Sequence, residues 1–193
     1  MSKVTRLECV KPNWVRVVNA ARRTRGKNPI NHEPSNKFKK SILLAEHSPI
    51  RLLEYDFTWE DIKQWVTAHF VRHHEGCEKF VHSQRTDIDP NLKGLNRDNF
   101  PQGLINDMDM TCNAQSFINI SRKRLCKGCA SKETREAWEN VINYLKEIDP
   151  ILASVCVPEC IYRGFCPEND RCCGYCNTEK FKKDLEEYRK IPN

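Results

Sequence analysis

The sequence lacks any apolar segment long enough to cross a lipid bilayer. Its mean hydropathy is −0.70, and no stretch approaches the roughly 20 apolar residues that a membrane-spanning helix needs. The start of the chain, residues 1–4, also lacks the apolar core of a signal peptide. We therefore expect no membrane partner and a cytoplasmic location, or the host cytoplasm if a phage encodes the protein.

Internal repeats and low-complexity tracts are absent as well. The 193 residues, 39% hydrophobic and 30% charged, are enough for one compact domain with a core. The 32 Lys and Arg residues outnumber the 26 Asp and Glu residues, and the net charge of +6 favours anionic ligands. These basic residues do not form a continuous stripe with interleaved aromatic residues, which argues against a nucleic-acid partner.

Cysteine, in contrast, is abundant. The chain has 11 cysteines, and those that follow residue 120 make up most of them. The expected cytoplasmic location is reducing, and a reducing compartment does not favour a framework of structural disulfides. Two CxxC pairs, Cys126 with Cys129 and Cys173 with Cys176, together supply the four thiolates of a structural zinc site. Ordinary buried or free thiols are an equally weighted alternative, and a redox pair is a third.

Hydrophobic spacing predicts the order of the local elements. Alternation predicts strands at 4–10 and 52–59, the second with Tyr55, Phe57 and Trp59 on one face. Helical spacing predicts helices at 14–21, 38–47, 60–70, 112–125, 132–146 and 179–190. Ser131 is the expected N-cap of the helix at 132–146, and Tyr144 belongs to its expected buried stripe. Residues 71–101 have no regular pattern, and we expect a binding loop there.

Basic and amide side chains are concentrated in that irregular region. Arg72-His73-His74 and Ser83-Gln84-Arg85 are followed by Arg97. Guanidinium groups bind phosphates and carbonyl-bearing rings through paired donors, so such a cluster suits a nucleotide. A solvated basic surface is the competing interpretation.

The order of these residues resembles the flavin-dependent thymidylate synthases, the ThyX family, whose signature is R-H-R-x7-S-x-R. Arg72-His73-His74 is followed, one residue late, by Ser83-Gln84-Arg85. Further matches lie at Ala20-Ala21-Arg22, at Glu46-His47-Ser48-Pro49 before Tyr55-Asp56-Phe57, at Arg97-x3-Pro101, at Asn113-Ala114-x-Ser116 with Asn119 and Arg124, and at Ala130 with Glu133 and Arg135. The resemblance covers most of residues 4–150.

The resemblance implies an α+β fold, a twisted, mostly antiparallel sheet with flanking helices, assembled as a homotetramer. It implies a flavin-dependent thymidylate synthase, a methyltransferase in which NADPH reduces FAD, methylenetetrahydrofolate supplies a one-carbon unit to C5 of dUMP, and flavin hydride completes the methyl group of dTMP. Its partners would be nucleotide and folate small molecules. No cysteine need be catalytic. Residues 1–155 would form the flavin- and nucleotide-binding catalytic domain, and residues 156–193 a cysteine-rich extension with a charged helix.

The resemblance also implies roles for individual residues. The expected dUMP ligands are His69, Arg72, Ser83, Gln84, Arg85, Arg97 and Arg124. Arg124 would hold the uracil ring and favour its C5-nucleophilic form, and Ser83 would contact the nucleotide without forming a covalent bond. The expected FAD ligands are His47, Arg72, His73, His74, Asn113, Gln115 and Asn119.

The chain departs from the family pattern around the expected substrate. His74 stands where the family has Arg, His69 where it has Gln, Thr86 where it has Tyr and Gln115 where it has Arg, and the loop before Ser83 lacks the family's Asn-Glu pair. Two alternatives therefore stay open: a related flavoenzyme that modifies C5 of another uridine nucleotide, and a cysteine-rich, metal-stabilised nucleic-acid-binding module on the same scaffold.

Overall fold

The protein is described by a computed structural model over residues 2–10 and 13–192; Met1, Lys11, Pro12 and Asn193 lie outside this description. Its strands are β1 (Lys3–Cys9), β2 (Glu54–Lys63), β3 (Cys77–Val81) and β4 (Ile105–Asn113). Its α-helices are α1 (Trp14–Arg23), α2 (Asn36–Leu44), α3 (Gln64–Phe70), α4 (Ala114–Arg124), α5 (Lys132–Ile148), α6 (Pro150–Ala153), α7 (Glu159–Arg163) and α8 (Glu179–Arg189). Three short 3₁₀ turns lie at Ser48–Leu52, Arg97–Asn99 and Tyr175–Asn177.

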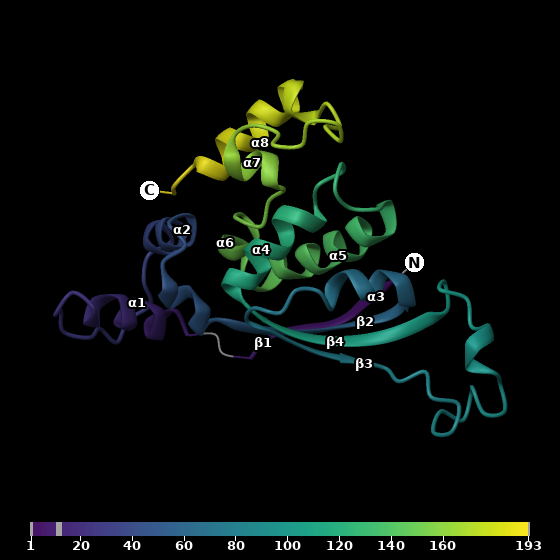
Figure 1. Ribbon diagram of the computed structural model, residues 1–193. Helices are drawn as coiled ribbons and strands as arrows, with labels where there is room; N and C mark the ends of the chain where they lie inside the picture. Colours follow the sequence, from purple (N-terminus) through teal and green to yellow (C-terminus); the bar gives the residue numbers. More distant parts are fainter. Residues whose placement is uncertain (1, 11–12, 193) are drawn as a thin grey trace.

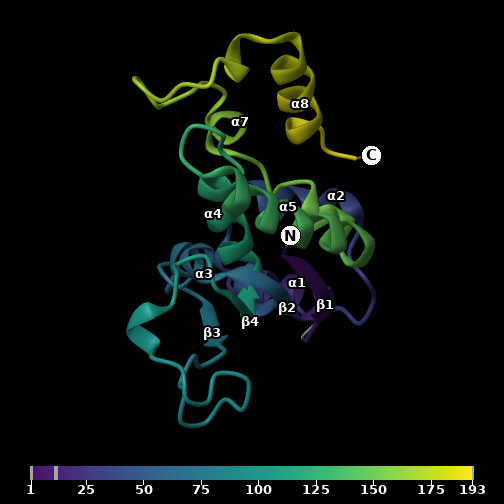
Figure 2. The same cartoon turned by 90° about the vertical axis from the view of Figure 1, so that its right-hand side faces the viewer.

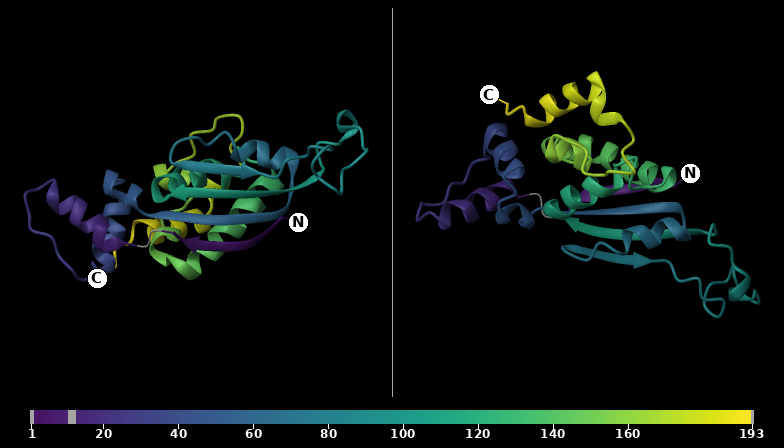
Figure 3. Two further views of the ribbon diagram at one scale, coloured as in Figure 1. Left: turned by 90° about the horizontal axis from the view of Figure 1, so that it is seen from below. Right: turned by 45° about the horizontal axis from the view of Figure 1, so that its top comes forward.

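The four strands form one sheet in the order β1-β2-β4-β3, and each neighbouring pair is antiparallel. Helices α3, α4 and α5 lie on one face of this sheet, and none of the described helices covers the opposite face (Figures 1 and 3). The predicted α+β class and the antiparallel sheet with flanking helices are confirmed.

The core lies between the sheet and the helices. Tyr55, Phe57 and Trp59 alternate along β2 and are fully buried on the helix side, as the sequence predicted. Their rings meet aromatic side chains of the helices: the Tyr55 and Phe117 centroids lie 5.4 Å apart, and Phe57 and Trp138 lie 5.9 Å apart. These edge-on contacts fix α4 and α5 against β2.

The uncovered face of the sheet is polar. Thr58 donates to Asp109 at 2.6 Å, Thr111 donates to Asp56 at 3.0 Å, and Arg6 pairs with Asp56 at 2.6 Å. The alternation of β2 and β4 therefore separates a buried apolar face from a hydrogen-bonded one that tolerates water.

Several expected boundaries were wrong, among them two where strands meet helices. Residues 60–63 continue β2 instead of opening a helix, because Ile62 and Lys63 still pair with β4 beyond an irregularity at Asp61, whose φ is +56°. The helix expected from residue 112 begins at Ala114, after β4 has ended at Asn113, whose side chain caps it by accepting a hydrogen bond from the Ser116 N–H at 3.0 Å.

Three further expectations have mixed outcomes. The segment 71–101, in which no regular element was expected, contains the short edge strand β3. The strand β4, which follows it, was not predicted. Tyr144 is 42% exposed and does not belong to the buried stripe of α5, because it lies toward the solvent side of that helix. The Ser131 cap is confirmed, since its Oγ accepts from the Thr134 N–H at 3.3 Å.

The carboxyl-terminal segment packs onto the same core as the rest. Cys156, Cys160, Ile161, Phe181 and Tyr188 are buried, and α7 and α8 lie beyond α4 and α5 on the side away from the sheet (Figures 1 and 2). In the described part of the chain, none of the helices has the length and apolar character needed to span a bilayer.

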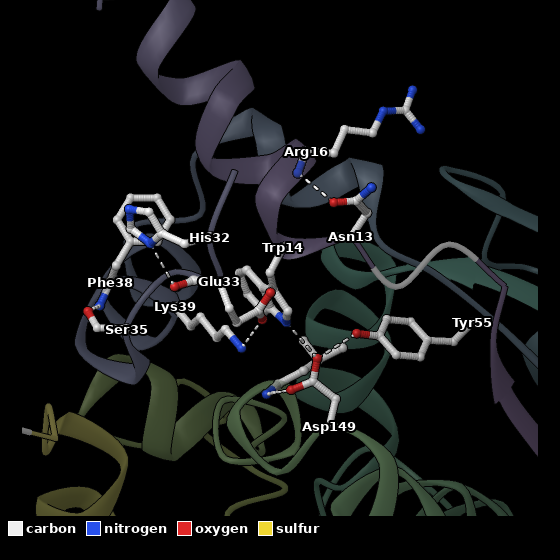
Figure 4. A network of polar contacts seen from close by, with 11 residues as sticks. Asn13, Trp14, Arg16, His32, Glu33, Ser35, Phe38, Lys39, Tyr55 and Asp149 are labelled. Carbon is white, nitrogen blue, oxygen red and sulfur yellow. Dashed lines mark hydrogen bonds and ion pairs between the residues drawn. The ribbon is translucent and has the colours of Figure 1, made fainter. Parts of the chain in front are cut away.

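Asp149 joins three distant parts of the chain (Figure 4). Its carboxylate accepts hydrogen bonds from Tyr55 OH at 2.7 Å, from Trp14 Nε1 at 3.2 Å and from the Leu152 N–H at 2.9 Å. Burial, and then the Asp149 charge, raise the pKa of Tyr55 far above its usual range, so its hydroxyl remains a donor. One buried acid thus holds α1, β2 and the start of α6 together.

We predict that Asp149→Ala destabilises the fold by about 2–4 kcal/mol, because it leaves the Tyr55 hydroxyl and the Trp14 indole buried without an acceptor. Urea denaturation would measure this loss. The matched control is Asp170→Ala at an exposed position, where we expect a change within about 0.5 kcal/mol. Equal effects of the two substitutions would contradict the assigned role.

Candidate functional site

The loop at 71–76, between α3 and β3, lies against the beginning of α4. The Asn113 N–H donates to the Gly76 carbonyl at 2.9 Å. Gly76 has φ +66°, and a Cβ there would lie 2.1 Å from Asn113 Nδ2. Only glycine fits this close approach. Ser116 completes the junction, since its hydroxyl donates to the Glu75 carbonyl at 2.6 Å.

Arg124, at the last turn of α4, is held by two histidines of the preceding elements. Its Nε donates to His73 Nε2 at 3.0 Å, and its Nη2 donates to the His69 carbonyl at 2.6 Å. The ring of His69 is itself held, because Nδ1 lies 2.7 Å from Thr134 Oγ1 on α5. The guanidinium therefore has a fixed orientation, and its Nη1 donors are not used in these contacts.

Positive charge is concentrated around this arginine. Burial, then Arg72, lower the pKa of Arg124, and burial, then Arg124 and Arg72, lower that of His69. Burial, followed by Arg124, Lys79 and His74, lowers the pKa of His73 to about 4, so His73 is neutral near pH 7 and can accept from Arg124.

Neither Arg72 nor Arg124 has a carboxylate partner within ion-pair distance among residues 2–10 and 13–192. Lys79 adds a third cation nearby and donates to the His73 carbonyl. Two guanidinium groups that form no ion pair within the described ranges repel each other, and an anionic ligand would relieve that repulsion. The arrangement can therefore bind an anion.

Two adjoining hollows open beside this cluster and share Glu75, Ser116 and Asn119. One, of about 350 Å³, is also lined by Arg72, His73, His74, Cys77 and Ile120. The other, of about 800 Å³, is also lined by Glu46, Arg51, Gly76, Asn113 and Gln115.

Two acids, Glu46 from the turn after α2 and Glu75, line the second hollow, and Glu46 is paired. Arg122 forms an ion pair with it, and Gln115 Nε2 donates to its other oxygen at 2.5 Å. Arg122 also stacks 3.5 Å from the centroid of Tyr162. This carboxylate is neutralised within the wall of the hollow, so it does not oppose an anion there.

The structure brings most of the predicted site residues to this one place. His69, Arg72, His73, His74, Asn113, Gln115, Asn119 and Arg124 all line or support the two hollows. His47 is exposed on the turn beside Glu46.

Four predicted residues lie elsewhere in the single chain, on an excursion of residues 82–104 that we call the arm. The arm leaves the sheet at the Val81 end of β3 and projects beyond it (Figures 1 and 2), whereas the 71–76 loop meets the Cys77 end. Ser83, Arg85 and Arg97 are exposed there, and Arg85 donates to Asp87 at 3.0 Å. Gln84 Nε2 is buried and has no hydrogen-bond partner in the described part of the chain. One chain does not bring these side chains to Arg124, so their roles stay predictions.

The expected zinc ligands do not form a ligand set. Cys126 is buried and Cys129 partly buried, while Cys173 is exposed and Cys176 partly buried. Across the described ranges, no three His, Cys, Asp or Glu side chains are grouped so that they could hold a metal ion.

Comparison with known proteins gives a match at the level of structure. Neither models of protein families nor curated protein sequences match the chain. PolB from Streptomyces cacaoi, a UMP/dUMP methylase solved with 5-Br dUMP, matches with a TM-score of 0.61 and 13% identity over 86% of this chain and 95% of that one. The chain shares its fold with PolB. The structure of PolB with 5-Br UMP matches with a TM-score of 0.55 and 12% identity, over 80% and 92% of the two chains.

Sequence reasoning missed several residues that build the site. Gly76 was not singled out, although an isolated glycine in a charged loop indicates a close approach or a positive φ. Arg122 and Thr134 were missed because their partners, Glu46 and His69, are distant in sequence, and Lys79 was missed because its contact with the His73 carbonyl depends on the fold of the loop between them. Only the fold brings these pairs together.

We predict that His73 makes stability depend on pH. Its pKa in the folded protein, about 4, lies below the value of about 6.5 expected when it is unfolded, so protonation favours unfolding. Its contribution is fully present above about pH 6.5 and is lost as the pH falls toward about 4, by about 1–2 kcal/mol after allowance for solvent screening.

Urea denaturation at pH 7.5 and at pH 5 tests this dependence. His73→Gln should lose part of the pH-dependent difference, whereas His32→Gln, at an exposed position, should keep all of it. The same pH dependence in His73→Gln and in the unaltered protein would contradict a neutral, half-buried His73.

Proposed function

We propose that the protein methylates C5 of a uridine nucleotide at the cluster formed by Arg72 and Arg124. The observation that carries this proposal is a pair of guanidinium groups, without carboxylate partners among the described residues, beside a hollow on a fold shared with a UMP/dUMP methylase. A phosphate and the two carbonyls of uracil are the acceptors that such donors recognise.

Arg124 would act on the base and Arg72 on the anion. The contacts from Arg124 to His73 and to the His69 carbonyl leave its Nη1 donors for a uracil carbonyl. A fixed cation at that oxygen stabilises the negative charge that develops as C5 becomes nucleophilic. Neutral His73 orients Arg124 without adding a competing charge.

The finer form of the proposal is a flavin-dependent thymidylate synthase that uses methylenetetrahydrofolate and NADPH to convert dUMP to dTMP. The residues fit FAD: the hollow of about 800 Å³ is lined by the amides of Asn113, Gln115 and Asn119, and the close approach at Gly76 fixes the Asn113 side chain in its wall. His47, Arg72, His73 and His74 would hold it from the adjoining edges. When bound, FAD would supply the hydride that completes the methyl group.

UMP is a second candidate substrate. PolB is described as a methylase of both UMP and dUMP and was solved with the brominated form of each. Two of the positions at which this chain departs from the ThyX pattern, His69 and His74, lie at the proposed nucleotide site. A preference for the ribose of UMP over the deoxyribose of dUMP is consistent with that placement.

We also propose that the arm completes the site of another subunit in a homotetramer. Ile88 and Leu95 are 60% and 53% exposed on the arm, and Phe80 is 65% exposed on β3. Exposed apolar groups on a projecting segment indicate a protein contact. A second copy of the chain would cover them and could bring Ser83, Gln84, Arg85 and Arg97 to a nucleotide that Arg124 holds.

We predict that Arg124→Ala lowers turnover of dUMP by roughly 100-fold or more, since it removes the charge that stabilises the reacting ring. Arg124→Lys should also be impaired, because an ammonium lacks the planar fork. The readout is dTMP formed in the presence of FAD, NADPH and methylenetetrahydrofolate, with UMP assayed in parallel.

Arg25→Ala is the matched control, since it removes the same charge from an exposed position outside the cluster. It should leave turnover unchanged. A protein that binds no FAD and methylates neither nucleotide would refute the enzymatic proposal, and binding of DNA by that protein would favour the nucleic-acid module.

Mixing two inactive variants tests the shared site. If Arg85 and Arg124 reach one nucleotide from different subunits, refolded mixtures of Arg85→Ala and Arg124→Ala should recover up to about a quarter of the activity, because random assembly leaves that share of sites with both arginines. Mixtures that stay inactive while forming tetramers would show that the arm acts within its own chain or not at all.

A further inference from the structure

Cys77 and Cys112 lie directly opposite each other on β3 and β4. The Asn113 N–H donates to the Gly76 carbonyl and the His82 N–H to the Asp107 carbonyl, each at 2.9 Å. The first of these bonds joins the neighbours of Cys77 and Cys112, so the two cysteines exchange no backbone hydrogen bond with each other. The second bond has the same spacing along the antiparallel ladder, in which hydrogen-bonded and non-hydrogen-bonded pairs alternate. Cys77 and Cys112 therefore form a non-hydrogen-bonded pair. In such pairs the Cα atoms lie about 4.5 Å apart, which is within the range that a disulfide spans.

The two sulfur atoms already face each other. Cys112 Sγ donates to Cys77 Sγ at 3.0 Å, and the side chains are 1% and 5% exposed. A covalent bond between them requires no shift in the register of the strands.

The two thiols differ in reactivity. The hydrogen bond from Cys112 lowers the pKa of Cys77, against the effect of burial, and Ser116 and Lys79 act in the same direction. Burial raises the pKa of Cys112 well above its usual value. Cys77 also lines the hollow that contains Arg72 and His73, so a small oxidant can approach it.

We propose that Cys77 and Cys112 form a peroxide-sensitive dithiol that closes into a disulfide beside the anion site. The Cys77 thiolate attacks one oxygen of hydrogen peroxide, which breaks the O–O bond, gives the sulfenic acid and releases hydroxide. The Cys112 thiol then attacks the Cys77 sulfur and displaces its oxygen as a second hydroxide, and its own proton and that of the first thiol convert the two hydroxides into water. Both sulfurs are oxidised by one electron and the peroxide is reduced to two waters.

Closure would stabilise the edge of the sheet. β3 has five residues and pairs only with β4 in the sheet. The bond would also close the chain between residues 77 and 112, which includes the whole arm. Restricting that loop in the unfolded state should raise the Tm by about 5–10 °C and slow hydrogen exchange in β3. Nothing in this reaction depends on the proposed methylation.

Peptide mapping of the full chain tests the bond directly. Trypsin separates the two thiols into peptides 73–79 and 98–122, each with a single cysteine. After limited hydrogen peroxide and quenching with N-ethylmaleimide, we expect these two peptides joined through a bond that dithiothreitol cleaves. In Cys112→Ala, we expect a sulfenic acid on Cys77 that dimedone traps.

Cys156→Ala is the matched control, because Cys156 is buried without a cysteine partner. It should form the same crosslink as the unaltered protein. Recovery of both peptides as N-ethylmaleimide adducts, or of Cys77 as the sulfinic acid with Cys112 free, would overturn the proposal whether or not the variants fold.

Discussion

The structure depends on burying one face of the central strand pair, β2 and β4, beneath α4 and α5. Tyr55, Phe57 and Trp59 supply the aromatic half of that contact, and Phe117 and Trp138 receive them from the helices. Because α4 begins where β4 ends, the same burial fixes the direction of α4. The position of Arg124, three turns along that helix, follows from it.

The candidate site can hold cations together because the fold supplies neutral acceptors for them. Arg124 donates to the His73 ring and to a backbone carbonyl, not to a carboxylate. An acidic partner would neutralise the guanidinium before a ligand arrived, whereas these acceptors orient it and leave its charge available. The cost is repulsion between Arg72 and Arg124, which binding of an anion would offset.

Part of this arrangement could be predicted from the sequence. Strict alternation predicted the buried face of β2, and Ser131 predicted the start of α5. The strand β4 also alternates, with Met108, Met110 and Cys112 buried, but Asp107, Asp109 and Thr111 alternate with them, and these polar residues indicate a strand only once a polar sheet face is known. The extension of β2 past Asp61 depends on pairing with β4, which no local pattern records.

Some of the site residues could also be predicted from the sequence, and others could not. His73, Asn113 and Arg124 follow a recognisable order, and the fold brings them together. The supports at Gly76 and Thr134 act across elements that are distant in sequence, so periodicity cannot reveal them. The arm residues lie away from Arg124 in the single chain, so their predicted role depends on the proposed contact with a second copy of the chain.

Release of tritium from [5-³H]dUMP and [5-³H]UMP tests the central claim most directly, because it reports cleavage of the C5–H bond whatever the one-carbon product. With FAD, NADPH and methylenetetrahydrofolate present, we expect tritium to enter water from at least one of the two nucleotides. That release should require both folate and protein. Retention of all tritium by a folded protein that binds the nucleotide would contradict C5 chemistry at this site.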